Sequence, residues 1–167
     1  DFNEHHVQWR DEVRRSFAAI TGFPLPTKFP EEDTPAARQV LLEQRWKDGG
    51  MPPALLATYK GISVDEKANA VVADFVRRKI REIVKDPTVA GILCPPDDLP
   101  IGSKRPPIDT DYYRTFNRDN VTLVDVKRAP IERITANGIR TGEAEYDLDA
   151  IIFATGFDAM TGTLLAI

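Results

Sequence analysis

The sequence is short of the residues on which many functional sites depend. Its 167 residues include one cysteine, Cys94, and two adjacent histidines, His5 and His6. A lone cysteine cannot close an internal disulfide, which predicts a reducing, cytoplasmic setting. Adjacent residues on a helix do not face each other, so the histidines predict an exposed pair rather than metal ligands. No other spacing typical of a metal site is present, and we expect no metal.

Long apolar runs and an excess of positive charge are also missing. No run approaches the roughly 20 residues of a membrane-spanning helix, and no signal peptide is recognisable. The formal net charge is −4, whereas a nucleic-acid-binding surface is usually basic. With 42% hydrophobic and 29% charged residues, the composition is that of a soluble globular protein. We therefore expect neither a membrane nor a nucleic acid as a partner.

Glycine-rich motifs of common enzyme classes are absent. The chain contains no Gly-x-Ser-x-Gly elbow and no Gly-x-Gly-x-x-Gly turn. The second motif is the turn that holds a dinucleotide pyrophosphate at a helix N-terminus. The chain also begins at Asp1 in helical register and stops at the apolar segment Leu164–Ile167, whereas natural termini are usually polar and loose. These features predict an internal piece of a longer polypeptide.

Helical patterns dominate the first hundred residues and also occur shortly after them. Apolar side chains recur at helical spacing, and prolines or paired glycines interrupt the pattern. The predicted helices cover residues 4–17, 35–47, 54–59, 64–84, 87–93 and 109–117.

Capping residues refine three of these helices. Thr34 precedes a proline and predicts an N-cap, and Asp86 does the same for the helix that ends near Leu93. Ser63 and Glu66 fit a capping box for the longest helix. The basic residues between positions 77 and 85 predict a solvated helix face.

Strand patterns begin near residue 120. Residues 121–126 and 130–135 each predict a strand, and Asn137-Gly138 predicts a hairpin because both residues accept positive φ. The returning segments, 139–141 and 145–146, complete an expected β-meander. The apolar run that follows, Ala150–Ala154, predicts a strand buried on both faces, ended by Thr155-Gly156.

A long irregular connection from Cys94 to Pro107 separates the helical and strand regions. Long connections of this kind are commonly functional. Its end carries two successive cations, Lys104 and Arg105, behind the hinge residue Gly102. Pro106 restricts Arg105 to an extended backbone. Composition alone favours ordinary solvated charge for both side chains.

Four stretches carry a resemblance to a known family. They are Gly102-Ser103-Lys104-Arg105, the run from Asp111 to Asp125, the pair Pro130-Ile131, and the run from Ala154 to Gly162. Together they resemble the flavin-dependent Baeyer-Villiger monooxygenases, such as the cyclohexanone, phenylacetone and steroid monooxygenases. The resemblance is specific from Gly102 to Gly162 and weaker in the helical half.

The resemblance implies an α/β fold, a partial Rossmann-like NADPH domain with a helical insertion and a β-meander. Residues 1–100 would be the helical insertion, residues 101–150 the C-terminal part of the NADPH domain, and residues 151–167 a linker strand that returns to the FAD domain. The implied reaction uses NADPH and O2 to insert oxygen beside a ketone carbonyl, giving an ester or lactone, with heteroatom oxidation as a second reaction. The implied cofactors are FAD and NADPH.

Five residues match positions to which the family gives a role. Arg105 matches the active-site arginine, whose permanently charged guanidinium would stabilise negative charge on oxygen. Lys104 matches a lysine that contacts the ribose phosphate of NADPH. Thr155, Gly156 and Asp158 match the segment that links the two dinucleotide domains, where contact with cofactor or a purely structural hinge are both open.

The departures from the family define what the chain lacks. Both glycine turns, the family's fingerprint with its histidine and tryptophan, and the acidic partner of the arginine are absent. We therefore expect the chain to be inert alone and to depend on the remainder of its own polypeptide, together with a ketone and O2. Two alternatives stay open: an amine-hydroxylating flavin monooxygenase, which would lack the Lys104-Arg105 pair, and a stand-alone helical interaction module without redox activity.

Overall fold

A computed structural model describes residues 2–15, 26–47, 53–104 and 110–156. Arg105 and Asp158 lie outside the described residues, as does the predicted helix end at Gly49-Gly50. The chain divides into two compact units, Asp1–Thr122 and Leu123–Ile167, and each is described here by itself.

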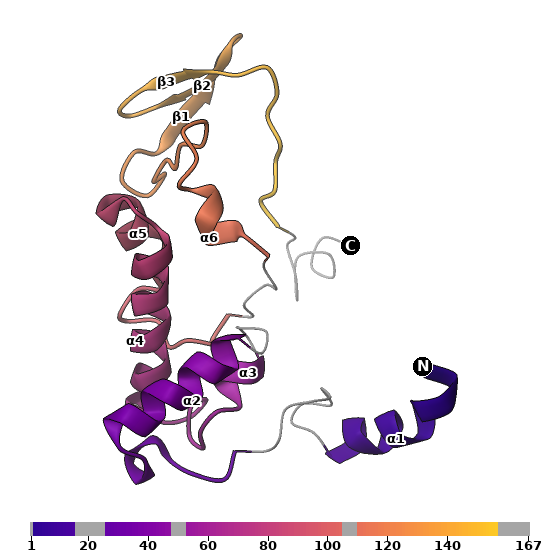
Figure 1. Cartoon of the computed structure of the whole chain (residues 1–167). Helices are drawn as coiled ribbons and strands as arrows, with labels where there is room; N and C mark the ends of the chain where they lie inside the picture. The colour runs from indigo at the N-terminus through magenta and orange to yellow at the C-terminus, as the bar shows by residue number, and fades with distance from the viewer. Residues whose placement is uncertain (1, 16–25, 48–52, 105–109, 157–167) are drawn as a thin grey trace, which may run out of the picture. The chain divides into compact units, whose positions relative to one another are not determined.

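The first unit is helical and the second contains a sheet, so the chain mixes helix and sheet (Figure 1). The helices are α1 (Phe2–Arg15), the 3-10 helix η2 (Pro30–Glu32), α2 (Pro35–Lys47), α3 (Pro53–Leu56), α4 (Glu66–Ile83), α5 (Pro87–Leu93) and α6 (Tyr112–Thr115). The strands are β1 (Ile131–Ile134), β2 (Gly138–Thr141) and β3 (Glu145–Asp147). In the described part of the chain, no helix is both long enough and apolar enough to cross a membrane.

Helix α4 is the centre of the helical unit. Helices α2, α5 and α6 all contact it, and α3 contacts α2. The apolar stripe of α4 supplies most of the core, together with Leu55, Tyr59 and Ile62 from the preceding segment. The largest core side chain on α4 is Phe75, which is 1% exposed and meets the Trp46 ring edge-on, with 6.0 Å between ring centroids.

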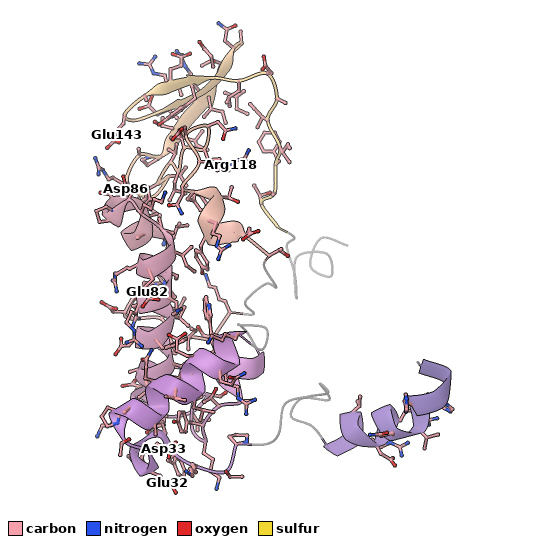
Figure 2. The ribbon with its side chains drawn as sticks, viewed as in Figure 1. Glu32, Asp33, Glu82, Asp86, Arg118 and Glu143 are labelled. Carbon is pink, nitrogen blue, oxygen red and sulfur yellow. The ribbon has the colours of Figure 1, made fainter. Side chains whose placement is uncertain are left out.

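Local capping explains where three of these helices begin. Thr34 Oγ1 accepts a hydrogen bond from Ala37 N at 3.2 Å, which confirms the predicted N-cap of α2. Asp86 Oδ1 accepts from Thr88 N at 2.7 Å, which confirms the cap of α5 (Figure 2). The capping box at Ser63 is wrong.

Asp65 caps α4 in place of Ser63. Its Oδ1 accepts from Ala68 N at 2.8 Å. The reason lies in the preceding turn, where Gly61 has a φ of +84° and its carbonyl accepts the Val64 and Asp65 amides at 2.9 and 2.8 Å. This turn uses the residues around Ser63, so the helix starts two positions later than the capping-box pattern predicts.

The predicted solvated face of α4 is wrong in part. Lys79 is inserted between two carboxylates, with Nζ 3.2 Å from Glu43 Oε2 on α2 and 2.9 Å from Glu82 Oε2. These bonds, that to Glu82 first, raise the pKa of Lys79. Arg77 is also buried, at 9% exposure, whereas Arg81 and Lys85 are exposed as predicted.

The second unit is a three-stranded antiparallel meander in the order β1-β2-β3, which confirms the predicted meander and hairpin. Thr135 N donates to Gly138 O at 2.9 Å and closes the turn. A Cβ at Gly138 would lie 1.9 Å from Tyr146 O, so this position requires glycine. The register shifts between Ile131 and Arg133.

Two predicted strands do not form. Residues 121–126 and 148–156 have no strand structure, and Ile152 and Phe153 are 90% and 69% exposed. A buried strand needs neighbouring strands to pair its backbone and cover its side chains. The described residues offer none for this segment, so the apolar run remains uncovered. The Rossmann-like detail stays a prediction.

Candidate functional site

The loop between α5 and Lys104 lies against α4 and runs antiparallel to it. Its first residues contact the Arg77 side chain, and its last residues contact Asn69, two turns earlier on the helix. Both contacts are between a side chain of the helix and the backbone of the loop. The loop therefore has a fixed path although it contains no regular structure.

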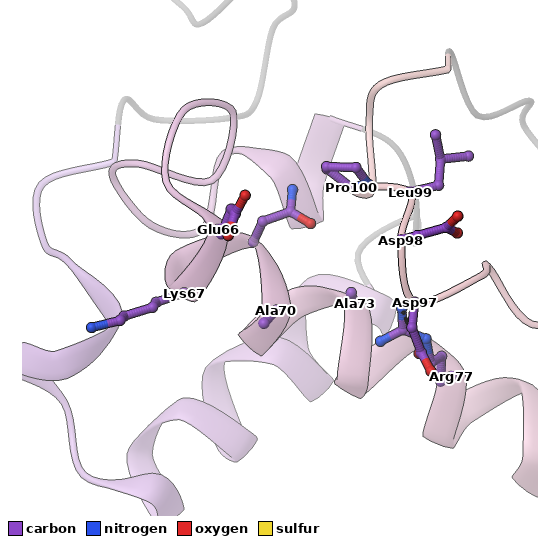
Figure 3. A pocket seen from close by; sticks show the side chains of 10 residues that line it. Glu66, Lys67, Ala70, Ala73, Arg77, Asp97, Asp98, Leu99 and Pro100 are labelled. Atoms are coloured by element: carbon purple, nitrogen blue, oxygen red, sulfur yellow. Dashed lines mark ion pairs between the residues drawn. The ribbon is translucent and has the colours of Figure 1, made fainter.

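Arg77 holds the start of this loop. Its Nε donates to Pro95 O at 3.0 Å and its Nη2 to Pro96 O at 3.1 Å. The same guanidinium lies 3.0 Å from Asp74 Oδ1 and 3.2 Å from Asp97 Oδ1. Figure 3 shows Arg77 on α4 beside Asp97 of the loop. A guanidinium with five donors suits this task, because it can satisfy carbonyls and carboxylates together.

Asn69 holds the end of the loop. Its side chain is buried, with the residue 6% exposed. Nδ2 donates to Ile101 O at 2.9 Å and to Ile62 O at 2.8 Å, and Oδ1 accepts from Ile101 N at 2.9 Å. The amide thus pairs with both backbone groups of Ile101, as a neighbouring strand would. All three of these hydrogen bonds are to backbone groups. A hydrophobic side chain at this position could not form them.

Gly102 sets the direction in which the chain leaves this anchor. Its φ is +88°, and a Cβ there would lie 3.0 Å from Leu56 Cδ2, so both conformation and space favour glycine. Ser103 then turns back, with Oγ donating to Pro100 O at 2.6 Å. Ile101 is 7% exposed in the core, and Lys104 emerges exposed three residues later.

An open groove of about 500 Å³ lies beside this loop, between residues 66–77 of α4 and residues 97–100 (Figure 3). Its wall carries both signs of charge, from Lys67 and Arg77 on one hand and from Glu66, Asp97 and Asp98 on the other. Arg77 is already committed to the loop. The charges that line the groove therefore indicate no particular class of ligand. The informative feature here is the contact between α4 and the loop.

Comparison with known proteins shows which enzymes the chain is similar to. No family model matches it. The chain is 42% identical over 164 residues to 2-oxo-Δ3-4,5,5-trimethylcyclopentenylacetyl-CoA monooxygenase of Pseudomonas putida, covering 92% of the chain and 30% of that protein. It is 44% identical over 154 residues to a Baeyer-Villiger monooxygenase of Pseudooceanicola batsensis, covering 91% of the chain and 27% of that protein.

Solved structures show a similarity to the same kind of enzyme. The crystal structure of OTEMO in complex with FAD and NADP is 40% identical to the chain, with a TM-score of 0.89. The match covers 99% of this chain and 31% of the OTEMO chain. The chain is a homologue of part of the Baeyer-Villiger monooxygenases. It spans about 30% of the length of the relatives it matches.

Three of the five residues predicted from the Baeyer-Villiger pattern are described. Lys104 is exposed at the end of the anchored loop, in the first unit. Thr155 and Gly156 are exposed in the second unit, where Gly156 has a φ of +84° and no atom of the described residues would lie within 4 Å of a Cβ there. Arg105 and Asp158 lie outside the described residues. The roles of all five stay predictions.

Sequence reasoning missed Asn69 and Arg77, the two residues that anchor the loop between α5 and Lys104, called the motif loop below. Asn69 and Arg77 are eight positions apart, with the buried Ala73 midway, so all three share one face of α4. Polar residues on the apolar stripe of a helix require buried partners. The position of Asn69 and Arg77 on the apolar face could therefore have indicated buried partners. The basic residues that follow Arg77 instead led to the prediction of a solvated face.

Proposed function

We propose that the chain is part of a flavin-dependent Baeyer-Villiger monooxygenase. The reaction uses NADPH and O2 to insert an oxygen atom beside a ketone carbonyl, which gives an ester or a lactone. Oxidation of a heteroatom is the second reaction of the same site. The observation that carries the proposal is the match of 99% of the chain to a structure bound to FAD and NADP, together with Gly-Ser-Lys-Arg at the end of an anchored loop.

The described residues fit one part of NADPH. Lys104 is an exposed cation that follows three residues after Ile101, whose backbone is hydrogen-bonded to Asn69. A compact ammonium group suits a phosphate. Lys104 would therefore hold the ribose phosphate of NADPH. Thr155, Gly156 and Asp158 would contact cofactor through their backbone, where an exposed glycine allows close approach.

FAD requires residues that this chain does not contain. Three described helices have an identified side-chain cap, Thr34 on α2, Asp65 on α4 and Asp86 on α5, and each of these side chains accepts a hydrogen bond from an N-terminal amide. A pyrophosphate needs such amides free, after a glycine turn. The remainder of the polypeptide would hold FAD, which supplies the activation of O2 when bound.

Arg105 would act on charge rather than on protons. Its guanidinium stays charged at any working pH. It would stabilise the negative charge that develops on oxygen during attack on the ketone, the effect that usually contributes most to such reactions. The Asn69 anchor would limit where this charge can be, since only three residues separate Ile101 from Arg105.

The domain assignment follows from the same proposal. Residues 1–100 would be the helical insertion of the NADPH domain, residues 101–150 its C-terminal part with Rossmann-like character, and residues 151–167 the linker strand toward the FAD domain. The exposed apolar side chains of Ile152 and Phe153 support this role for the last segment, because they would be covered by the remainder of the polypeptide in a cytoplasmic enzyme.

The test uses the full polypeptide that carries this segment. Purified protein should show the absorption of an oxidised flavin, oxidise NADPH, and convert a panel of cyclic and linear ketones to esters detected by mass spectrometry. Arg105→Ala should abolish ester formation while NADPH still reduces the flavin. Arg114→Ala is the matched control, because Arg114 is an exposed arginine that forms a local ion pair with Asp111, and it should keep full ester formation.

Two results would contradict the proposal. A full polypeptide without flavin absorption would favour the alternative of an interaction module. Ester formation that persists in Arg105→Ala would remove the role given to the guanidinium.

A further inference from the structure

We infer that Asn69 is a positioning residue for Lys104, and that it thereby helps to select NADPH over NADH. The inference rests on the proposed function, in which Lys104 binds the ribose phosphate that only NADPH carries. It adds a residue from the helical part, far along the chain from the motif, to the machinery that recognises the cofactor.

The first step is the strength of the anchor. The Asn69 carboxamide makes a reciprocal pair of hydrogen bonds with Ile101, at 2.9 Å in each direction, and a third bond to Ile62 O at 2.8 Å. The residue is 6% exposed. Water cannot easily replace these bonds in a buried position, so loss of the carboxamide leaves the Ile101 backbone groups unpaired.

The second step is the short path from the anchor to the cation. Ile101 is buried, Gly102 is fixed by its positive φ and its contact with Leu56, and Ser103 is bonded back to Pro100 through both N and Oγ. Lys104 follows directly. Each residue between anchor and cation is thus constrained, and release of Ile101 removes the constraint that faces α4.

The third step separates positioning from general stability. Asn117 makes the same type of bonds elsewhere in the helical unit: Nδ2 donates to Ile83 O at 2.8 Å and Oδ1 accepts from Lys85 N at 2.8 Å. These bonds tie the end of α4 to the turn after α6 and do not touch the loop before Lys104. Asn117 is therefore the matched control.

The experiment measures kcat/KM of the full flavoprotein with NADPH and with NADH, in the wild type and in four variants: Lys104→Ala, Asn69→Ala, their double mutant, and Asn117→Ala. The NADPH-to-NADH ratio is the readout, because a general loss of folded enzyme lowers both values equally. Lys104→Ala should lower the ratio by about tenfold or more, the usual effect of losing a charge-assisted hydrogen bond.

Asn69→Ala should lower the same ratio by about threefold or more, mainly through KM for NADPH, and Asn117→Ala should leave it unchanged. In the Lys104→Ala background, Asn69→Ala should cause no further change, because coupled residues are not additive. If Asn69→Ala yields no flavoprotein, Asn69→Ser carries the same test.

The contradicting results are distinct. If Lys104→Ala lowers the ratio but the Asn69 variants keep the wild-type ratio, the inference is wrong and the proposed function stands. An Asn69 effect of equal size with and without Lys104 also overturns the inference. If Lys104→Ala itself leaves the ratio unchanged, the role of Lys104 is wrong and the inference fails with it.

Discussion

The helical unit and the sheet unit differ most in what their side chains cover. In the first, α4 buries an apolar stripe against α2, α5 and α6, and its core residues Val72 and Ile80 are 0% exposed. In the second, every residue of β1 is exposed, with Ile131 and Ile134 at 52% and 56%. The two units contain similar kinds of apolar residue but use them differently.

The two units therefore differ in whether their apolar side chains are buried within the unit itself. Burial of apolar surface stabilises a fold by about 25 cal/mol per Å², and the helical unit gains this within its own residues. The sheet gains mainly backbone hydrogen bonds, which contribute little net stability. We call the helical unit closed, because its apolar side chains are buried, and the sheet unit open, because β1 is exposed. The proposed function requires such an open unit, whose exposed side chains would be covered by the remainder of the polypeptide.

Separation of the units is the most severe test of the comparison. A peptide of residues 1–122 should retain helical circular dichroism and unfold cooperatively in urea. A peptide of residues 123–167 should show no cooperative transition, because a small sheet without a covered face is marginal in water. Cooperative unfolding of the second peptide would show that the sheet unit is stable alone.

Point mutations sharpen the comparison. Phe75→Ala should lower the free energy of unfolding by about 3–5 kcal/mol, since it removes a buried ring and leaves a cavity. Ile134→Ala in β1 should change it by less than about 0.5 kcal/mol, because more than half of this residue is already exposed. Urea denaturation followed by circular dichroism measures both. Equal losses would contradict the division into a closed and an open unit.

Two glycines test whether the motif loop is held as described. Gly102→Ala should destabilise by about 1–3 kcal/mol, because alanine is strained at positive φ and its Cβ would meet Leu56 at 3.0 Å. Gly91→Ala in α5 should stabilise by about 0.5–1 kcal/mol, because nothing lies within 4 Å of its Cβ. Thermal unfolding of the matched pair should shift in opposite directions. Shifts of the same sign would show that Gly102 is not constrained.

The smallest expected effect concerns pH. Asp33 accepts from Lys28 Nζ at 2.9 Å and from Tyr59 OH at 3.0 Å, and these bonds, that to Lys28 first, lower the pKa of Asp33. A lowered carboxyl pKa gives stability that is present above about pH 4 and lost as the pH falls through the folded value. Asp33→Asn should therefore flatten the acid side of the stability curve.

The alkaline side should also slope. Burial, and then the bond to Asp33, raise the pKa of Tyr59 to about 12. A raised pKa gives stability that is present below the unfolded value near 10 and lost as the pH rises toward the folded value. Tyr59→Phe should remove this slope. Urea midpoints measured across pH would contradict the assignment if the two variants kept the wild-type profile.

Local signals in the sequence predicted much of the fold. Thr34, Asp86 and Asn137-Gly138 each act on neighbours within a few residues, and the structure has the expected cap or turn at each. The start of α4 was misplaced because both Ser63 and Asp65 can cap a helix. Only the turn at Gly61, which depends on tertiary packing, decides between them.

Distant partners explain the rest. Asn69 and Arg77 act on loop backbone that lies 18 to 32 residues later, which no local pattern reveals. The run at Ala150–Ala154 has the composition of a buried strand but finds no strand beside it in the described residues. Its apolar pattern indicates that this segment needs partners to cover it, and the described residues do not supply them.

Amide hydrogen exchange on residues 150–154 tests this requirement most directly. In the 167-residue chain these amides should exchange at nearly the rate of an unstructured peptide, while the Ile101 amide, bonded to Asn69, should be protected. In the full polypeptide, residues 150–154 should become protected by at least about a hundredfold, as expected for a buried paired strand. Equally fast exchange of residues 150–154 in both proteins would contradict the account that this segment completes its packing elsewhere in the enzyme.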